Sequence, residues 1–160
     1  MQAMLNRAYG HKGTSMLEIY QNCNVFNDGA FFTFTDKATK AQATVFLEHG
    51  QPLIFGDNQD KGIHYNCGQP VIVDLSDGSY TADDLWVHDE TDLTKANLLA
   101  RIFDDPLTGD NLPRPFGVFY DVQAETYEDA MTRQLQEAMT NQGKGDLDDL
   151  LRGDSTWTVD

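Results

Sequence analysis

Residues 14–31, TSMLEIYQNCNVFNDGAF, decide the fold that the sequence predicts. The first seven, Thr14 to Tyr20, are mostly β-branched, aromatic or aliphatic, which is typical of a β-strand. Their apolar run is nearly continuous and is interrupted by Glu18. A strand of this kind is expected to be buried on both faces of a parallel sheet.

A polar loop follows this strand. It is rich in residues that bend or cap the backbone, namely Asn22, Asn24, Asn27, Asp28 and Gly29. In open α/β sheets, ligands bind at the carboxyl ends of the strands. The order of strand and loop therefore predicts that Cys23 lies at the edge of the sheet where a ligand would bind.

The remaining sequence predicts an α/β chain with short strands and amphipathic helices. Helices are expected over residues 1–9, 36–43 (a short helix or turn), 92–103, 127–141 and 146–152. Strands are expected over residues 43–47, 52–55, 70–75 and 116–120. Loops are expected over residues 56–68 and 104–115. Asp92 is the expected N-cap of its helix. The helix at 127–141 is expected to direct one apolar side inward through Tyr127, Ala130, Met131, Leu135, Ala138 and Met139.

The charge of the chain is strongly negative and unevenly distributed. The 160 residues carry a net charge of -15, with 5 basic and 8 acidic residues in 1–80 against 6 and 18 in 81–160. Such a second half repels nucleic acid and anionic membranes. It indicates a soluble surface, a salty habitat or a basic partner. No apolar run approaches the roughly 18 residues of a membrane span. The N-terminal residues also lack the apolar core of a signal peptide. We therefore expect a cytoplasmic protein.

Several residues could carry chemistry, but none forms a complete motif. Cys23 and Cys67 lack the spacing of a self-contained zinc site. Cys23 could pair with His11 or be a buried, inert thiol. The loop 10–13, GHKG, could contact a phosphate, although a plain turn is the simpler interpretation. The cluster 88–90, HDE, could be a metal or general-base site, but an exposed polar turn is favoured. The tryptophans Trp86 and Trp157 are expected in the core or in an interface.

The run from His11 to Phe31 resembles the β subunit of 2-oxoacid:ferredoxin oxidoreductases, specifically the 2-oxoglutarate branch. Four further segments carry the resemblance: LEHGQPLIFG at 47–56, DKGI at 60–63, VHDE at 87–90 and LPRPFGVFY at 112–120. The resemblance covers most of residues 10–130 and is weak in the acidic tail.

The resemblance implies an enzyme subunit with several cofactors. The family's β subunit binds thiamine diphosphate with magnesium and a four-iron four-sulfur cluster. With its α subunit it oxidatively decarboxylates a 2-oxoacid, passes electrons to ferredoxin and transfers the acyl group to coenzyme A. The last of the cluster's four cysteines lies in the Q-N-C segment, which maps onto Cys23. The family's CxxC pair and its G-D-G-D motif do not occur here.

The resemblance therefore implies the C-terminal portion of such a subunit. Residues 1–31 would be the end of the thiamine-diphosphate-binding parallel-sheet domain. Residues 32–130 would be a small mixed α/β extension, and residues 131–160 a helical acidic tail. We expect this portion to be inactive alone. The alternative is a stand-alone, non-catalytic module that binds the α subunit or another partner.

Overall fold

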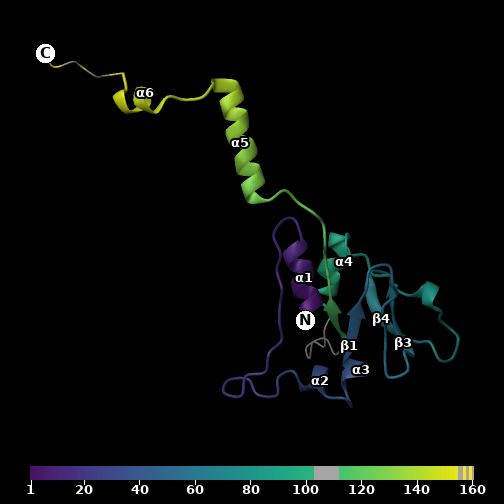
Figure 1. The fold of residues 1–160 in the computed structure, drawn as a ribbon. Helices are drawn as coiled ribbons and strands as arrows, with labels where there is room; N and C mark the ends of the chain where they lie inside the picture. Colours follow the sequence, from purple (N-terminus) through teal and green to yellow (C-terminus); the bar gives the residue numbers. More distant parts are fainter. Residues whose placement is uncertain (103–111, 155–156, 158, 160) are drawn as a thin grey trace. The chain divides into compact units, whose positions relative to one another are not determined.

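The computed structural model describes residues 1–102, 112–154, 157 and 159. The elements, in chain order, are α1 (Gln2–Gly10), α2 (Phe32–Thr35), α3 (Lys40–Ala43), β1 (Thr44–Leu47), β2 (Ile54–Phe55), β3 (Lys61–Asn66), β4 (Gln69–Asp74), the 3-10 helix η1 (Ala82–Asp84), α4 (Leu93–Leu99), β5 (Arg114–Gly117), α5 (Tyr127–Gln142) and α6 (Leu147–Arg152) (Figure 1).

Two small sheets are present in the described part of the chain. β1 pairs in parallel with β5, in register from Thr44 opposite Arg114 to Leu47 opposite Gly117. β2, β3 and β4 form an antiparallel sheet in that order. The β3–β4 hairpin closes through Cys67 and Gly68, whose φ angles are 48° and 91°. Both angles fit a two-residue hairpin turn. The mixed α/β class predicted from the sequence is therefore confirmed.

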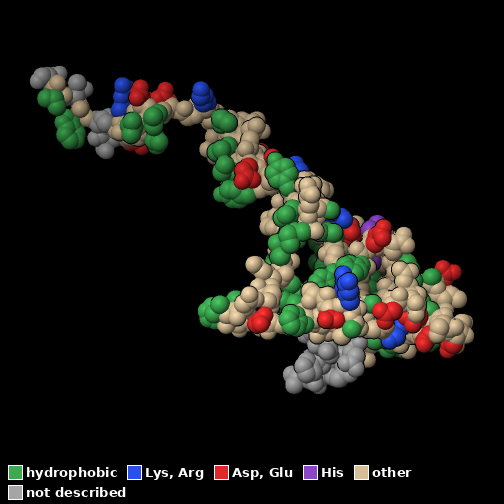
Figure 2. Space-filling model, turned by 60° about the horizontal axis from the view of Figure 1, so that its bottom comes forward, with side chains coloured by type: hydrophobic (Ala, Val, Ile, Leu, Met, Phe, Trp, Pro, Cys, Tyr) green, Lys and Arg blue, Asp and Glu red, His purple; other side chains and the backbone are tan. Residues whose placement is uncertain are grey.

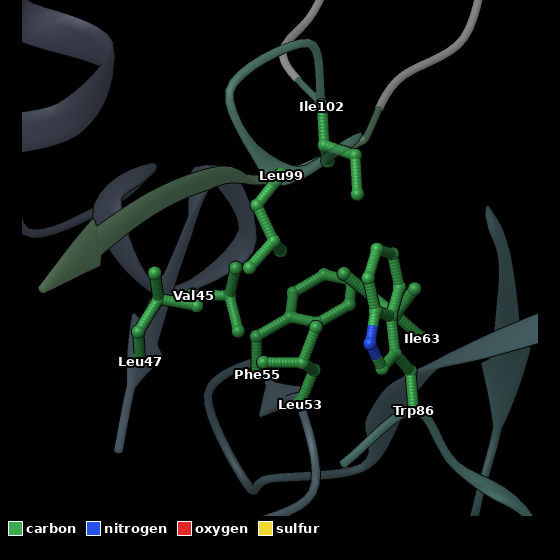
Figure 3. Close-up of a cluster of buried hydrophobic side chains, with 8 residues drawn as sticks. All are labelled: Val45, Leu47, Leu53, Phe55, Ile63, Trp86, Leu99 and Ile102. Carbon is green, nitrogen blue, oxygen red and sulfur yellow. The ribbon is translucent and has the colours of Figure 1, made fainter. Parts of the chain in front are cut away.

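The hydrophobic core joins these sheets to helix α4. It consists of Val45, Leu47, Leu53, Phe55, Ile63, Trp86, Leu99 and Ile102 (Figure 3). At Gly62 an added Cβ would come within 2.5 Å of the Leu85 side chain, so β3 approaches its neighbour closely only because this residue is glycine. The expectation of a core position is confirmed for Trp86, whereas Trp157 is exposed.

The prediction of a strand at residues 14–20 is wrong for this chain. These residues have no regular secondary structure, and the Met16 side chain is 90% exposed. A strand needs a hydrogen-bonding neighbour, and none of the described residues provides one. Of the apolar residues in this run, Tyr20 packs against Phe31 and Phe116, whereas Met16, Leu17 and Ile19 stay exposed.

Two other predictions need correction. Residues 56–68 are not simply a loop, because they contain β3. Pairing with β4 overrides the weak strand preference of the local sequence KGIHYN. The apolar side chains of α5 were expected to face inward, yet no residue of α5 is buried.

Helix α2 was not predicted from the sequence, whereas α1, α3, α5 and α6 lie where helices were expected. The Asp92 side chain caps α4 by accepting from the backbone N–H groups of Thr94 and Lys95. α4 ends at Leu99 rather than near Phe103, which itself lies outside the described residues. The strand expected at 116–120 is β5, shifted to begin at Arg114.

The chain divides into two compact units. One comprises residues 1–10 and 16–122, and the other comprises residues 11–15 and 123–160. Within the described residues, no helix is long and apolar enough to cross a membrane. The three-part division expected from the sequence remains a prediction.

Candidate functional site

The loop from Gln21 to Ala30, called here the Cys23 loop, is held in shape by its own polar side chains. The Asn22 side-chain amide donates to Asn24 at 2.8 Å and to Asp28 at 2.9 Å. The Asn22 side-chain oxygen Oδ1 accepts a hydrogen bond from the backbone N–H of Gly29 at 2.9 Å. Across the turn, the Asn27 N–H donates to the Cys23 carbonyl at 3.0 Å. Asn22 thus bridges both ends of the loop, as the abundance of turn formers predicts.

The electrostatic environment of Cys23 favours its thiolate. Backbone N–H groups of Phe26, Val25 and Asn27, in that order of importance, hold the pKa of the Cys23 thiol below its usual value. Partial burial of Cys23 raises the pKa of the thiol, but the backbone N–H groups lower it by more. The thiolate is the form of cysteine that binds metals and acts as a nucleophile. A lowered thiol pKa is typical of a ligating or reactive cysteine rather than an inert one.

An aromatic cluster anchors the chain on both sides of the Cys23 loop. The Tyr20 ring stacks on Phe31 with a centroid distance of 4.5 Å and meets Phe116 edge-on at 5.5 Å. Arg114 of β5 donates to the Tyr20 hydroxyl at 2.7 Å. Its guanidinium lies 4.8 Å from the centre of the Phe34 ring. These contacts fix both ends of the loop against β5. Sequence reasoning did not assign Arg114 a role, although the segment LPRPFGVFY contains it.

A cavity of about 500 Å³ lies beside this cluster. Its lining is mainly apolar and includes Leu17, Ile19, Phe31, Phe34, Phe116 and Phe119. Leu17 and Ile19 come from the run that was predicted to be a buried strand. The cavity therefore borders the apolar surface that this part of the chain leaves uncovered.

The cluster HDE at 88–90 is not the exposed turn that the sequence favoured. His88 is fully buried, and its Nε2 lies 2.8 Å from the Val118 carbonyl oxygen. Glu90 is also buried and forms an ion pair with Arg7. His49 Nδ1 accepts from the Glu90 backbone N–H at 3.2 Å. These contacts tie loops together, and the metal or general-base role of the cluster stays a prediction.

The GHKG loop takes part in the second unit. Lys12 pairs with Asp129 at 2.8 Å, and its backbone N–H donates to Gln123. His11 Nδ1 lies 3.5 Å from the Gln123 side-chain amide. His11 and Cys23 belong to different units, so the pairing of the two residues stays a prediction. Among the described residues, no group of three or more His, Cys, Asp or Glu side chains could hold a metal ion.

Comparison with known proteins confirms the resemblance to the oxidoreductase family. No family model matches the chain, and no solved structure matches it significantly. Over 161 residues the chain is 30% identical to the 2-oxoglutarate oxidoreductase subunit KorB of Mycobacterium tuberculosis (strain ATCC 25618 / H37Rv). The match covers 98% of this chain but 41% of that relative. Such partial coverage is consistent with the C-terminal portion predicted from the sequence.

Proposed function

We propose that this chain is a C-terminal portion of the β subunit of a 2-oxoglutarate:ferredoxin oxidoreductase. The complete enzyme would oxidatively decarboxylate a 2-oxoacid to an acyl-coenzyme A and reduce ferredoxin. The observation that carries the proposal is the Cys23 loop, because it stabilises a thiolate at the position where the family resemblance calls for a cluster ligand. The similarity to a 2-oxoglutarate oxidoreductase subunit supports the same function.

Cys23 fits one corner of a four-iron four-sulfur cluster. Clusters of this type are held by cysteine thiolates, and hydrogen bonds to sulfur tune their potential. Backbone N–H groups of Phe26 and Val25 already lower the pKa of the Cys23 thiol, and they would favour a bound thiolate in the same way. The other thiolates of the cluster would come from outside the described residues. When bound, the cluster would carry single electrons toward ferredoxin.

The described residues do not fit thiamine diphosphate or its magnesium ion. None of them forms a group of carboxylates that could hold a divalent cation. We therefore propose that this portion is inactive alone. Its contribution would be to hold the Cys23 thiolate and to keep the loop rigid through the Tyr20–Phe31–Arg114 contacts.

The exposed run at residues 14–20 supports a role as part of a larger assembly. Leu17 and Ile19 are exposed and line the apolar cavity. An apolar surface of this kind marks a contact with another protein segment. The rest of the same subunit would provide that contact, and the α subunit would complete the enzyme.

The proposal is tested with the complete gene product that contains this chain, co-purified with its partner subunit under anaerobic conditions. We expect ferredoxin reduction that requires both 2-oxoglutarate and coenzyme A. A stable complex with the partner subunit but no turnover on any 2-oxoacid would favour the non-catalytic module instead. Comparing 2-oxoglutarate with pyruvate identifies the substrate, which this chain does not define.

A further inference from the structure

The two C-terminal helices expose apolar stripes. On α5, Tyr127, Met131, Leu135 and Met139 recur every four residues, and Tyr127 is 78% exposed. On α6, Leu147, Leu150 and Leu151 share one side, with Leu150 77% exposed. Residues four apart lie on the same helix face. Each helix thus presents a continuous apolar face that no described residue of its own unit, residues 11–15 and 123–160, buries.

Caps and ion pairs support both helices although their apolar faces are exposed. The Thr126 hydroxyl caps α5 by accepting from the Asp129 N–H, and the Asp146 carboxylate caps α6. On α5, Arg133 pairs with Glu125 at 3.1 Å and with Glu137 at 3.2 Å. Caps and ion pairs favour helix formation without tertiary packing. The apolar faces are therefore pre-organised for binding.

The charge around these faces indicates which kind of surface can bind them. Residues 123–160 carry nine acidic and three basic residues. Figure 2 shows green apolar side chains at the surface of this segment together with red carboxylates. An apolar groove bordered by Lys and Arg would match both features.

A second copy of this chain does not fit that description. Residues 1–122 also carry an excess of acid, 17 acidic against 8 basic residues. A contact of the tail (residues 123–160, net charge -6) with residues 1–122 of a second copy (net charge -9) would bring together two regions of like charge. Like-charge juxtaposition opposes such a contact.

We propose that residues 126–152 form a docking segment. It lays the apolar faces of α5 and α6 into an apolar groove bordered by basic side chains on a different protein. This inference rests on the proposed function in one respect: the partner subunit of the same enzyme is the protein expected to carry the groove. Recognition of amphipathic helices by apolar grooves is a common binding mode.

The test measures binding of the gene product that contains this chain to the purified, immobilised partner subunit. The variant Leu135→Asp places a carboxylate on the apolar face of α5. Its matched control is Gln136→Asp. This variant adds the same negative charge at the following residue, which is exposed on the polar side of the helix. We expect Leu135→Asp to weaken binding at least tenfold and Gln136→Asp to change it less than threefold. Raising the salt from 50 to 300 mM should weaken wild-type binding.

The outcomes separate this inference from the proposed function. If wild type and Leu135→Asp bind equally well, the docking segment is wrong while the subunit assignment stands. If binding increases with salt, the basic border is wrong. If the wild type shows no binding to the partner subunit, the proposed function and this inference both fail. Circular dichroism of both variants verifies that helix content is unchanged.

Discussion

Arg7 in α1 binds two carboxylates from distant parts of the chain, Glu90 and Asp121. Its Nη1 lies 3.1 Å from Glu90 Oε1, and its Nε lies 2.9 Å from Asp121 Oδ2. A second contact joins Nη2 to Glu90 Oε2. The hydrogen bonds that Arg7 donates to Glu90, and then those to Asp121, raise the pKa of Arg7 above its usual value. The two carboxylates fasten α1 to the loop before α4 and to the segment after β5.

Replacing Arg7 with Ala should destabilise the chain. Glu90 is only 7% exposed, so the substitution leaves a buried carboxylate without its main partner. Arg7 itself is partly exposed, which reduces the effect below that of a fully buried pair. We expect a loss of about 1–3 kcal/mol of unfolding free energy. Urea unfolding followed by Trp86 fluorescence in a Trp157→Phe background measures it.

The control is Arg133→Ala, which removes an exposed guanidinium from α5. The ion pairs of Arg133 are exposed to solvent, so the loss of unfolding free energy should stay below about 0.5 kcal/mol. Equal losses for the two substitutions would show that burial of Glu90 does not matter. A double variant, Arg7→Met with Glu90→Gln, should lose less than the sum of the single variants.

Cys23 should react as a thiolate at a lower pH than an ordinary cysteine. In a Cys67→Ser variant, the rate of alkylation by iodoacetamide follows the thiolate fraction of Cys23 alone. Because backbone N–H groups lower the pKa of this thiol, the half-maximal rate should fall below the usual pH of about 8.5. Unfolding in urea removes those donors and should move the midpoint back up. A midpoint that is the same in the folded and unfolded chain would contradict the described loop geometry.

The isolated 160-residue chain should self-associate through residues 14–20. An extended segment with exposed apolar side chains and no regular secondary structure recruits strands of other chains. Size-exclusion chromatography at several concentrations should therefore show oligomers. The double variant Leu17→Lys with Ile19→Lys should shift the population toward monomer, whereas Val159→Lys in the tail should not. A clean monomer of the wild type at every concentration would refute this prediction and would favour the stand-alone module.

Local signals predicted most of the helices and several strands correctly. Asp92 and Asp146 are caps whose effect extends over only a few residues, so the sequence alone predicts where those helices start. Residues 14–20 failed because burial depends on neighbours that the run itself cannot reveal. β3 was missed for the related reason that its pairing with β4, and not its own composition, makes it a strand.

The site was predicted only in outline. The turn formers of the Cys23 loop identified a polar loop around a cysteine, and the structure adds the N–H groups that favour its thiolate. Arg114 and Tyr20 lie 94 residues apart in the sequence, so no local pattern could join them. At 88–90 the local pattern was typical of an exposed turn, but His88 and Glu90 are buried because they contact the distant residues Val118 and Arg7.

The iron content of a Cys23→Ser enzyme tests the central claim most directly. Serine keeps the size of the side chain but replaces a soft thiolate with a weakly ionised oxygen, which is a poor ligand for iron–sulfur clusters. In the complete subunit, co-purified with its partner, Cys23→Ser should lower the iron-to-protein ratio by more than half and reduce ferredoxin-linked turnover with it. Cys67→Ser, at the exposed hairpin turn, should leave both nearly unchanged. Full iron content in the Cys23→Ser enzyme, with an unaltered electron paramagnetic resonance signal after reduction, would contradict the assignment of Cys23 as a cluster ligand.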